Sequence, residues 1–359
     1  MARNEQHFVE NAIGKWNDIR QAKIELAQRF IHAPRAEAVR RNVGPFQASA
    51  RAATAAISPA PTWNVLGVGI GEKVSEGKQT GALAVKLFVR MKYPLAELDS
   101  KHALPKEISG IPTDVEEVGT FRRLQSAQAK RKPSGMPNPR TKIRPAQPGC
   151  SIGFQDPNNQ FTMAGTFGAV VKDKNGTYVL SNNHVLADEN RLPIGAAIFQ
   201  PGLLDGGNVA TDQIAALTRF INLDTQQPNT VDCAIAKATS QNLISSDILH
   251  IGAPQGAADA AIDMAVHKFG RTTGYTVGRV TSVDTDVTVQ YDLGNITFTG
   301  QIIIVGGVGQ SFSKAGDSGS LILQRGTNKA VALLFAGSAS HTIANHIADV
   351  LRALNVALA

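Results

Sequence analysis

The sequence predicts a mainly β protein, in which a β-barrel region follows an N-terminal helix and a small α+β module. Short apolar segments punctuated by glycine recur from Gly149 to the C-terminus, and residues 5–31 carry apolar side chains at helical spacing. A basic, proline-rich segment separates these two parts of the chain. We therefore expect four regions, which are residues 1–60, 61–120, 121–148 and 149–359.

The first region is predicted to be an amphipathic helix followed by a connector. Its apolar stripe consists of Phe8, Ala12, Ile13, Trp16, Ile19, Leu26 and Phe30. Such a stripe is buried either against its own chain or in a homo-oligomer, and the sequence favours neither. Residues 33–60 are rich in Ala and Arg and are expected to connect the helix to the next region.

The second region is predicted to be the small α+β module. Val65–Lys73 and Ala82–Met91 are joined by the polar, glycine-bearing stretch Ser75–Gly81, which indicates a β-hairpin. A short helix is expected at Pro94–Leu98 and a further strand at Ile111–Val118.

Residues 121–148 are predicted to be a basic linker. They contain eight Lys or Arg residues, five prolines and no acid, whereas the formal charge of the whole chain is +7. The excess charge thus belongs to one segment, which is expected to be an extended, mobile tether. The alternatives are a contact with an acidic partner or a nucleic acid, or a cleavage site for a basic-specific protease. Specific nucleic-acid binding is disfavoured, because no aromatic residues interleave with the charges.

The last region is predicted to be an all-β barrel structure, because it contains many short strands with turn signals between them. The expected strands are Thr166–Val171, Tyr178–Leu180, Ile198–Phe199, Val231–Ala236, Val277–Val283, Thr288–Tyr291, Gln301–Val305, Ser320–Gln324 and Ala330–Phe335. From His341 onward, apolar residues return to helical spacing and predict a C-terminal helix.

Three residues of this region fit nucleophilic catalysis. Ser318 lies in the turn Gly316–Gly319, and a serine hydroxyl needs an adjacent base during attack, for which His184 is the candidate. Asp232 is the candidate carboxylate that orients the imidazole. The predicted oxyanion donors are the backbone amides of Gly316 and Ser318. We expect the Asp317 carboxylate to be buried and paired, so that it holds the turn.

Each of these residues has a purely structural alternative. Asp-Ser-Gly is common in ordinary turns, and His184 could be a hydrogen-bonded histidine at a strand end. Asp232 is harder to explain in this way, because a carboxylate inside an apolar run is costly to bury unless it is paired. The three residues together, in the order His, Asp, Ser, favour catalysis.

On these motifs, the chain from about Gly149 onward resembles trypsin-like peptidases of the chymotrypsin fold. Gly270–Tyr275, followed by Val277–Val280, resembles the bacterial α-lytic and streptogrisin branch. Over its whole length the chain resembles a group of bacterial and plant trypsin-like proteins that includes the narrow-leaf proteins. The residues shared with that group are Gly165–Ala169, Leu180–Leu186, Gln200–Gly202 and Asp205–Gly207. The resemblance implies two β-barrels, a triad in the cleft between them, and an acyl-enzyme.

The resemblance also implies where the substrate pocket lies. The residue six positions before the nucleophile, Phe312, would form its floor, and the wall would come from the residues that follow the expected strand Ala330–Phe335. The expected pocket residues are Phe312, Ser313, Ala336, Gly337 and Ser338. No carboxylate is present there, so cleavage after Lys or Arg is disfavoured and a small or apolar side chain is favoured. His341 is a candidate contact to an acidic side chain.

The cysteine pattern indicates a reducing compartment. Secreted relatives carry a cysteine after the catalytic histidine, where this chain has Val185, and the chain has only Cys150 and Cys233. Neither cysteine has metal-type spacing, so we expect no structural zinc and no cofactor. Charges interrupt the first eighteen residues and no apolar run spans a bilayer, which predicts a cytoplasmic protein without a signal peptide or membrane contact.

Three functions are compatible with these features. The first is an active intracellular serine endopeptidase with a protein or peptide substrate, whose N-terminal regions regulate access or form an oligomer. The second is a latent peptidase or a non-proteolytic scaffold with the same fold. The third is a self-processing zymogen cut in the linker, although the acid-free pocket argues against cleavage at the Arg and Lys residues there.

Overall fold

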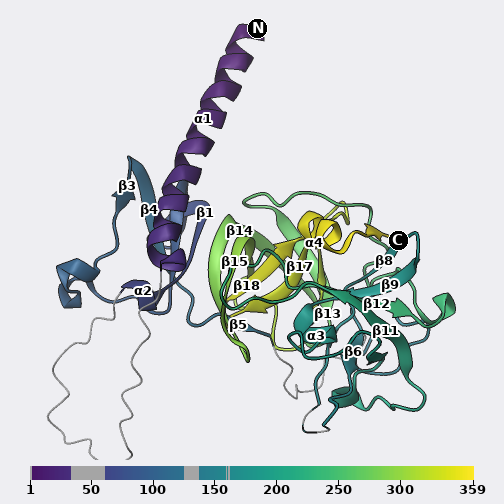
Figure 1. Cartoon of the computed structure of the whole chain (residues 1–359). Helices are drawn as coiled ribbons and strands as arrows, with labels where there is room; N and C mark the ends of the chain where they lie inside the picture. Colours follow the sequence, from purple (N-terminus) through teal and green to yellow (C-terminus); the bar gives the residue numbers. More distant parts are fainter. Residues whose placement is uncertain (1, 34–60, 125–136, 159, 161) are drawn as a thin grey trace, which may run out of the picture. The chain divides into compact units, whose positions relative to one another are not determined.

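The computed structural model describes residues 2–33, 61–124, 137–158, 160 and 162–359. The chain forms two compact units, Met1–Gly119 and Thr120–Ala359 (Figure 1). The predicted connector over residues 34–60 and the central part of the predicted linker, residues 125–136, lie outside the described residues.

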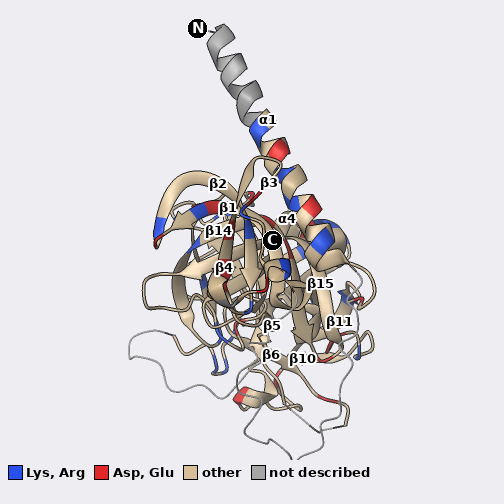
Figure 2. Cartoon of the chain, turned by 90° about the vertical axis from the view of Figure 1, so that its left-hand side faces the viewer, with Lys and Arg blue, Asp and Glu red and all other residues tan. Residues whose placement is uncertain are grey.

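The N-terminal unit begins with a long helix that is buried along one side of its later half. Helix α1 spans Ala2–Ala27 and continues as a π-helical turn, η1, over Gln28–His32. Ile19, Leu26 and Phe30 are buried, as their spacing predicted, whereas Trp16 is 37% exposed. Charged residues of both signs lie along the described part of α1 (Figure 2). The side chains of Phe8, Ala12 and Ile13 lie outside the described part.

The α1 helix packs against a small sheet in the same unit. Strands β1 (Val65–Ser75) and β2 (Lys78–Val89) form the predicted antiparallel hairpin. Strand β4 (Ile111–Glu117) pairs with β2 in parallel, and β3 (Glu107–Ile108) pairs with β4. The remaining elements of the unit are α2 (Pro61–Asn64) and two 3-10 turns, η2 (Leu95–Glu97) and η3 (Ser100–His102). The helix predicted near Pro94 is therefore a single turn.

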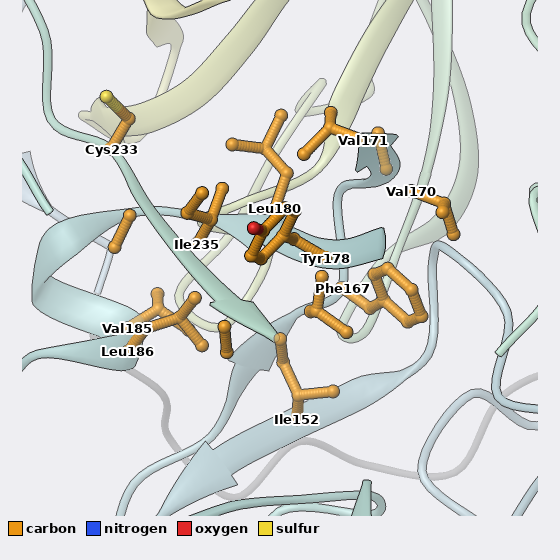
Figure 3. Close-up of a cluster of buried hydrophobic side chains, with 14 of the residues drawn as sticks. Ile152, Phe167, Val170, Val171, Tyr178, Leu180, Val185, Leu186, Cys233 and Ile235 are labelled. Carbon is orange, nitrogen blue, oxygen red and sulfur yellow. The ribbon is translucent and has the colours of Figure 1, made fainter. Parts of the chain in front are cut away.

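The first barrel of the second unit is an eight-stranded sheet with the order β19-β8-β9-β12-β11-β10-β6-β7. Its strands are β6 (Ser151–Phe154), β7 (Gly165–Thr166), β8 (Ala169–Asp173), β9 (Gly176–Ser181), β10 (Ala197–Phe199), β11 (Gln213–Phe220), β12 (Ala234–Ala238) and β19 (Ala357–Leu358). The short helix α3 (Asn183–Leu186) follows β9. Side chains from β8, β9, β12 and α3 meet in one buried cluster that includes Phe167 and Ile235 (Figure 3).

The second barrel closes on itself. Its strands are β13 (Ala265–Gly270), β14 (Gly274–Tyr291), β15 (Gly294–Gly306), β16 (Leu321–Gln324), β17 (Ala330–Gly337) and β18 (His341–His346). They follow the order β13-β16-β17-β18-β15-β14, and β13 also pairs with β14. The short strand β5 (Arg122–Arg123) pairs with β14 and β17. The predicted fold class, two β-barrels preceded by a helix and a small α+β module, is confirmed.

Several element boundaries differ from the prediction. The two strands expected at Val277–Val283 and Thr288–Tyr291 are one strand, β14, which bends at three register shifts against β15. The C-terminal helix α4 begins only at Ile347 and ends at Leu354, because His341–His346 pairs with β15 and β17 instead. Strand β12 begins at Ala234, so Asp232 lies just before it.

The described ends of the predicted linker are packed within the second unit, so the expectation of a tether over all of residues 121–148 was wrong. Ala146 is fully buried in the first barrel's core. Arg144 donates to the Gln200 carbonyl (2.9 Å), and Lys142 pairs with Asp212 (2.5 Å). The basic residues of the segment thus form ion pairs with acids from elsewhere in the chain, such as Asp212. Counting charges within the segment alone does not show these pairs.

Leu26→Ala should lower the free energy of unfolding of the N-terminal unit by about 3 kcal/mol, because it removes a fully buried side chain. Ile24→Ala, on the exposed side of the same helix, is the matched control and should cost less than about 1 kcal/mol. Urea denaturation followed by circular dichroism measures both. Equal losses would mean that the helix is not packed through Leu26.

Candidate active site

The structure brings His184 and Asp232 into direct contact. His184 lies on α3 in the first barrel, and its Nδ1 is 2.5 Å from Asp232 Oδ2. Both side chains are almost fully buried. Ser318 lies in the turn before β16 of the second barrel. A Cβ added at Gly165 would lie 2.6 Å from Val185 Cγ1 and 3.2 Å from the Ser318 carbonyl oxygen, so the serine turn adjoins the residue after His184.

Donors from both barrels satisfy the Asp232 carboxylate. Oδ1 accepts from the backbone amides of Asn183 (2.7 Å) and His184 (3.3 Å). Oδ2 accepts from the Tyr291 hydroxyl (2.7 Å) in addition to its contact with His184. Burial, and then the neighbouring Asp232 charge, raise the pKa of Tyr291 well above its ordinary value, so this phenol remains a donor.

An outer layer of buried amides fixes the backbone of Asp232. Asn345 Oδ1 accepts from the Asp232 amide (3.0 Å), and Asn345 Nδ2 donates to Gln301 Oε1 (2.7 Å). Asn182 Nδ2 donates to the Asp232 carbonyl (2.8 Å). Sequence reasoning missed Tyr291, Asn345 and Gln301. The available signal was a polar residue beside an apolar run, as at Gln301 before Ile302–Val305.

The Asp317 carboxylate is buried and paired, as predicted. Its Oδ1 accepts from the amides of Thr272 (2.8 Å) and Thr273 (3.0 Å), and its Oδ2 accepts from the Lys314 amide (2.9 Å). Lys268 Nζ lies 3.5 Å from Oδ2. Burial alone would raise the pKa of Asp317, but the Lys268 charge and these hydrogen bonds outweigh it and hold the pKa below its usual value.

The serine turn depends on a glycine after the nucleophile. Gly319 has φ +92°, and a Cβ at this position would lie 2.1 Å from Ser181 Oγ and 2.3 Å from the Thr166 carbonyl oxygen. Glycine alone therefore allows the turn to approach the first barrel this closely.

The Gly316 amide points at a carbonyl beside the serine hydroxyl. It donates to the Leu124 carbonyl oxygen (2.9 Å), and Ser318 Oγ lies 3.4 Å from the same oxygen. The Ser318 hydroxyl donates to the Phe335 carbonyl (3.1 Å), and no described residue forms a hydrogen bond with His184 Nε2, which is buried. The Gly316 amide and the Ser318 hydroxyl thus face the same carbonyl oxygen, and the hydroxyl is hydrogen-bonded to Phe335 rather than to His184 Nε2.

The expected pocket residues lie on or beside the second barrel. Phe312 is only 1% exposed and belongs to that barrel's apolar cluster. Ser313 Oγ is 2.6 Å from Thr342 Oγ1, and the Ser338 hydroxyl accepts from the His341 amide (3.3 Å). Ala336 and Gly337 pair with β5. Their role in binding a substrate stays a prediction.

Cys150 and Cys233 are free and buried. Burial raises the pKa of Cys150 to about 12 and that of Cys233 well above its ordinary value, so both thiols stay protonated. Among the described residues, no group of three or more His, Cys, Asp or Glu side chains could hold a metal ion. No helix in the described ranges is both long and apolar enough to cross a membrane.

Comparisons with known proteins give similarities to serine proteases. The family model described as the Nal1 C-terminal domain matches residues 245–345, which include Tyr291 and Ser318. No curated protein matches the chain. Similar solved structures include Thermobifida fusca protease A (18% identity, TM-score 0.42, covering 59% of this chain and 96% of that chain). Another is a glutamic acid specific serine protease (19% identity, TM-score 0.42, covering 59% of this chain and 100% of that chain). A third is the α-lytic protease homolog N4 (19% identity, TM-score 0.41, covering 61% of this chain and 100% of that chain). The site assignment rests on this chain's own geometry.

Lys268→Met should lower the free energy of unfolding by about 3 kcal/mol at pH 7, because it leaves the buried Asp317 carboxylate without its cation. In the native protein the lowered pKa of Asp317 stabilises the fold above the pKa of the unfolded chain, about 4. The variant lacks this contribution. The difference in free energy of unfolding between the native protein and the variant should therefore shrink as the pH falls below about 4. Urea denaturation at several pH values measures the deficit.

The exposed Lys329→Met is the control for Lys268→Met and should change stability by less than about 0.5 kcal/mol. A deficit for Lys268→Met that does not depend on pH would contradict a role through the Asp317 charge.

Proposed function

We propose that this protein is a serine endopeptidase that hydrolyses peptide bonds through Ser318, His184 and Asp232. The observation that carries the proposal is the buried His184–Asp232 contact of 2.5 Å, which leaves the other imidazole nitrogen unpartnered among the described residues. A structural histidine in a barrel core would be expected to use both ring nitrogens. A base that must accept a serine proton needs one of them free.

In the proposed reaction, the Ser318 hydroxyl first turns from the Phe335 carbonyl toward His184 Nε2. The Ser318 hydroxyl gives its proton to His184 Nε2 as its oxygen attacks the substrate carbonyl carbon. Asp232 holds the ring with Nδ1 facing it and stabilises the imidazolium, and the amides of Gly316 and Ser318 receive the oxyanion. The imidazolium then protonates the departing amine, which leaves an acyl-enzyme on Ser318. Water, activated by the same imidazole, hydrolyses this ester.

Tyr291 acts as a positioning residue in this proposal. Its hydroxyl occupies the second acceptor direction of Asp232 Oδ2 and comes from the opposite barrel to His184. The bond ties the orientation of the carboxylate to the docking of the two barrels. We further propose an intracellular setting with protein or peptide substrates, which the two free, buried cysteines support.

A latent form with the same fold is the second candidate. The bond from the Ser318 hydroxyl to the Phe335 carbonyl favours it, because a hydroxyl held there is not hydrogen-bonded to the base. A latent protein would keep the His184–Asp232 contact and still fail to react.

A fluorophosphonate probe of serine hydrolases should label the native chain and leave Ser318→Ala and His184→Ala unlabelled. Asp232→Asn should label at least about a thousandfold more slowly, since the imidazole would lose its orienting carboxylate. In-gel fluorescence over time measures the rates. Equal labelling of native protein and His184→Ala would sink the triad assignment, and no labelling of the native chain would favour the latent form.

Tyr291→Phe should slow labelling roughly tenfold, because it removes one hydrogen bond to a charged carboxylate without emptying the site. Tyr178→Phe is the matched control, because it removes a phenol that donates to Asp173 elsewhere in the first barrel (2.9 Å). Its labelling rate should equal the native one. The role of Tyr291 would be refuted by equal rates for the two variants at equal thermal stability.

A further inference from the structure

A segment of the chain itself lies along β17, the second strand after the nucleophile. Arg122 and Arg123 pair antiparallel with Gly337 and Ala336 of β17. Continuing that register places Leu124 opposite Phe335. Extended peptides bind sheet edges in this way, with main-chain bonds for affinity and alternate side-chain pockets for specificity. The segment thus lies in the manner of a bound peptide.

The end of this segment reaches the reacting groups. The Leu124 carbonyl oxygen accepts the Gly316 amide at 2.9 Å and lies 3.4 Å from Ser318 Oγ. This is where the carbonyl of a bond under attack would sit, beside the nucleophile and on an oxyanion donor. The Leu124 side chain packs on the apolar cluster that includes Phe312. Leu124 therefore occupies the position of the residue after which a substrate would be cut.

Arg123 occupies a built acidic subsite. Its Nε lies 2.5 Å from Glu189 Oε1, and its guanidinium also pairs with Asp292. The Glu189 side chain is completely buried, and its Oε2 accepts the Leu293 amide (2.9 Å). A buried carboxylate needs such partners, and a guanidinium supplies directional ones.

The backbone that presents Glu189 is unusual. Asp188, Glu189 and Asn190 have φ of +47°, +54° and +71°, in the left-handed region that non-glycine residues rarely adopt. The loop directly follows the helix of His184, and Asn183 Nδ2 holds it through Asn190 Oδ1 (2.7 Å). Consecutive residues in this conformation persist where the surrounding structure fixes them, often at a functional site.

We propose that Arg122–Leu124 occupies the substrate cleft in the manner of a bound substrate. In this proposal Leu124 stands for the substrate residue after which the chain is cut. Glu189 and Asp292 form the subsite for the substrate residue that precedes it, which Arg123 represents. Substrates are then peptide segments that carry arginine followed by a leucine-like residue, and the chain is cut after the latter. The predicted cleavage rests on the proposed function, whereas the predicted peptide binding does not. A tethered occupant competes at high local concentration, so the resting chain resists peptides supplied in trans.

Binding to the Ser318→Ala chain tests the inference without requiring activity. Two fluorescent peptides, Phe-Arg-Arg-Leu-Gln and Phe-Arg-Ala-Leu-Gln, differ only at the residue that would meet Glu189. A chain that also carries Arg123→Ala should bind the first peptide roughly tenfold more tightly than the second, by fluorescence anisotropy. Adding Glu189→Gln together with Asp292→Asn should erase this preference. Equal affinities for the two peptides before that change would overturn the proposed subsite.

Arg122→Ala is the matched control for freeing the subsite from Arg123. It also removes one positive charge, but from the neighbouring residue, whose side chain is exposed. It should leave peptide binding at the level of the Ser318→Ala parent, whereas Arg123→Ala should strengthen binding severalfold. Equal effects of the two substitutions would refute the built-in occupant.

If Arg123→Ala does not fold, the parent chain still tests the subsite. A tethered competitor weakens both peptides equally, so their affinity ratio persists in the parent, and a ratio of one overturns the inference. Fluorophosphonate labelling reports the triad separately. If the probe labels neither the native chain nor Arg123→Ala while the peptide preference is intact, the result counts against an active peptidase, favours the latent form and still supports the subsite.

Discussion

The buried carboxylate of Asp232 sets the geometry on which the site depends. Moving a carboxylate out of water costs several kcal/mol unless hydrogen bonds replace its hydration. Here those bonds come from Asn183 and His184 on one barrel and from Tyr291 on the other. The charge is therefore satisfied only when the barrels are docked. The orientation of the imidazole and the docking of the two barrels are consequences of the same requirement.

A second buried carboxylate, Asp317, plays a different part. It accepts from the amide of Thr272, between β13 and β14, and from the amide of Lys314 in its own turn, and it lies near the buried Lys268. Its bonds therefore shape the main chain around Ser318. Asp232 orients a side chain, whereas Asp317 orients a backbone. Both carboxylates are buried among hydrogen-bond donors, which explains why the residues around them are polar although the barrels are apolar.

The triad candidates and the pairing of Asp317 could be predicted, because short sequence motifs around these residues indicate their chemistry. The hairpin of β1 and β2 followed from local alternation and a glycine turn. Tyr291 and Asn345 could not be predicted as partners of Asp232, since the residues lie 59 and 113 positions away and only the closed barrel brings them together. The single long strand β14 was also missed, because its bulges interrupt the alternation that a strand normally shows.

The segment Arg122–Leu124 shows the same limit most clearly. Counted along the chain, its arginines belong to a run of positive charge, for which a solvated tether is the simplest interpretation. In the folded unit, Arg123 contacts Asp292, 169 positions away, and Glu189, which lies on a left-handed loop directly after helix α3. A run of basic residues can therefore be either hydrated or buried. The buried state requires a buried acid within reach, and here the loop after His184 supplies Glu189.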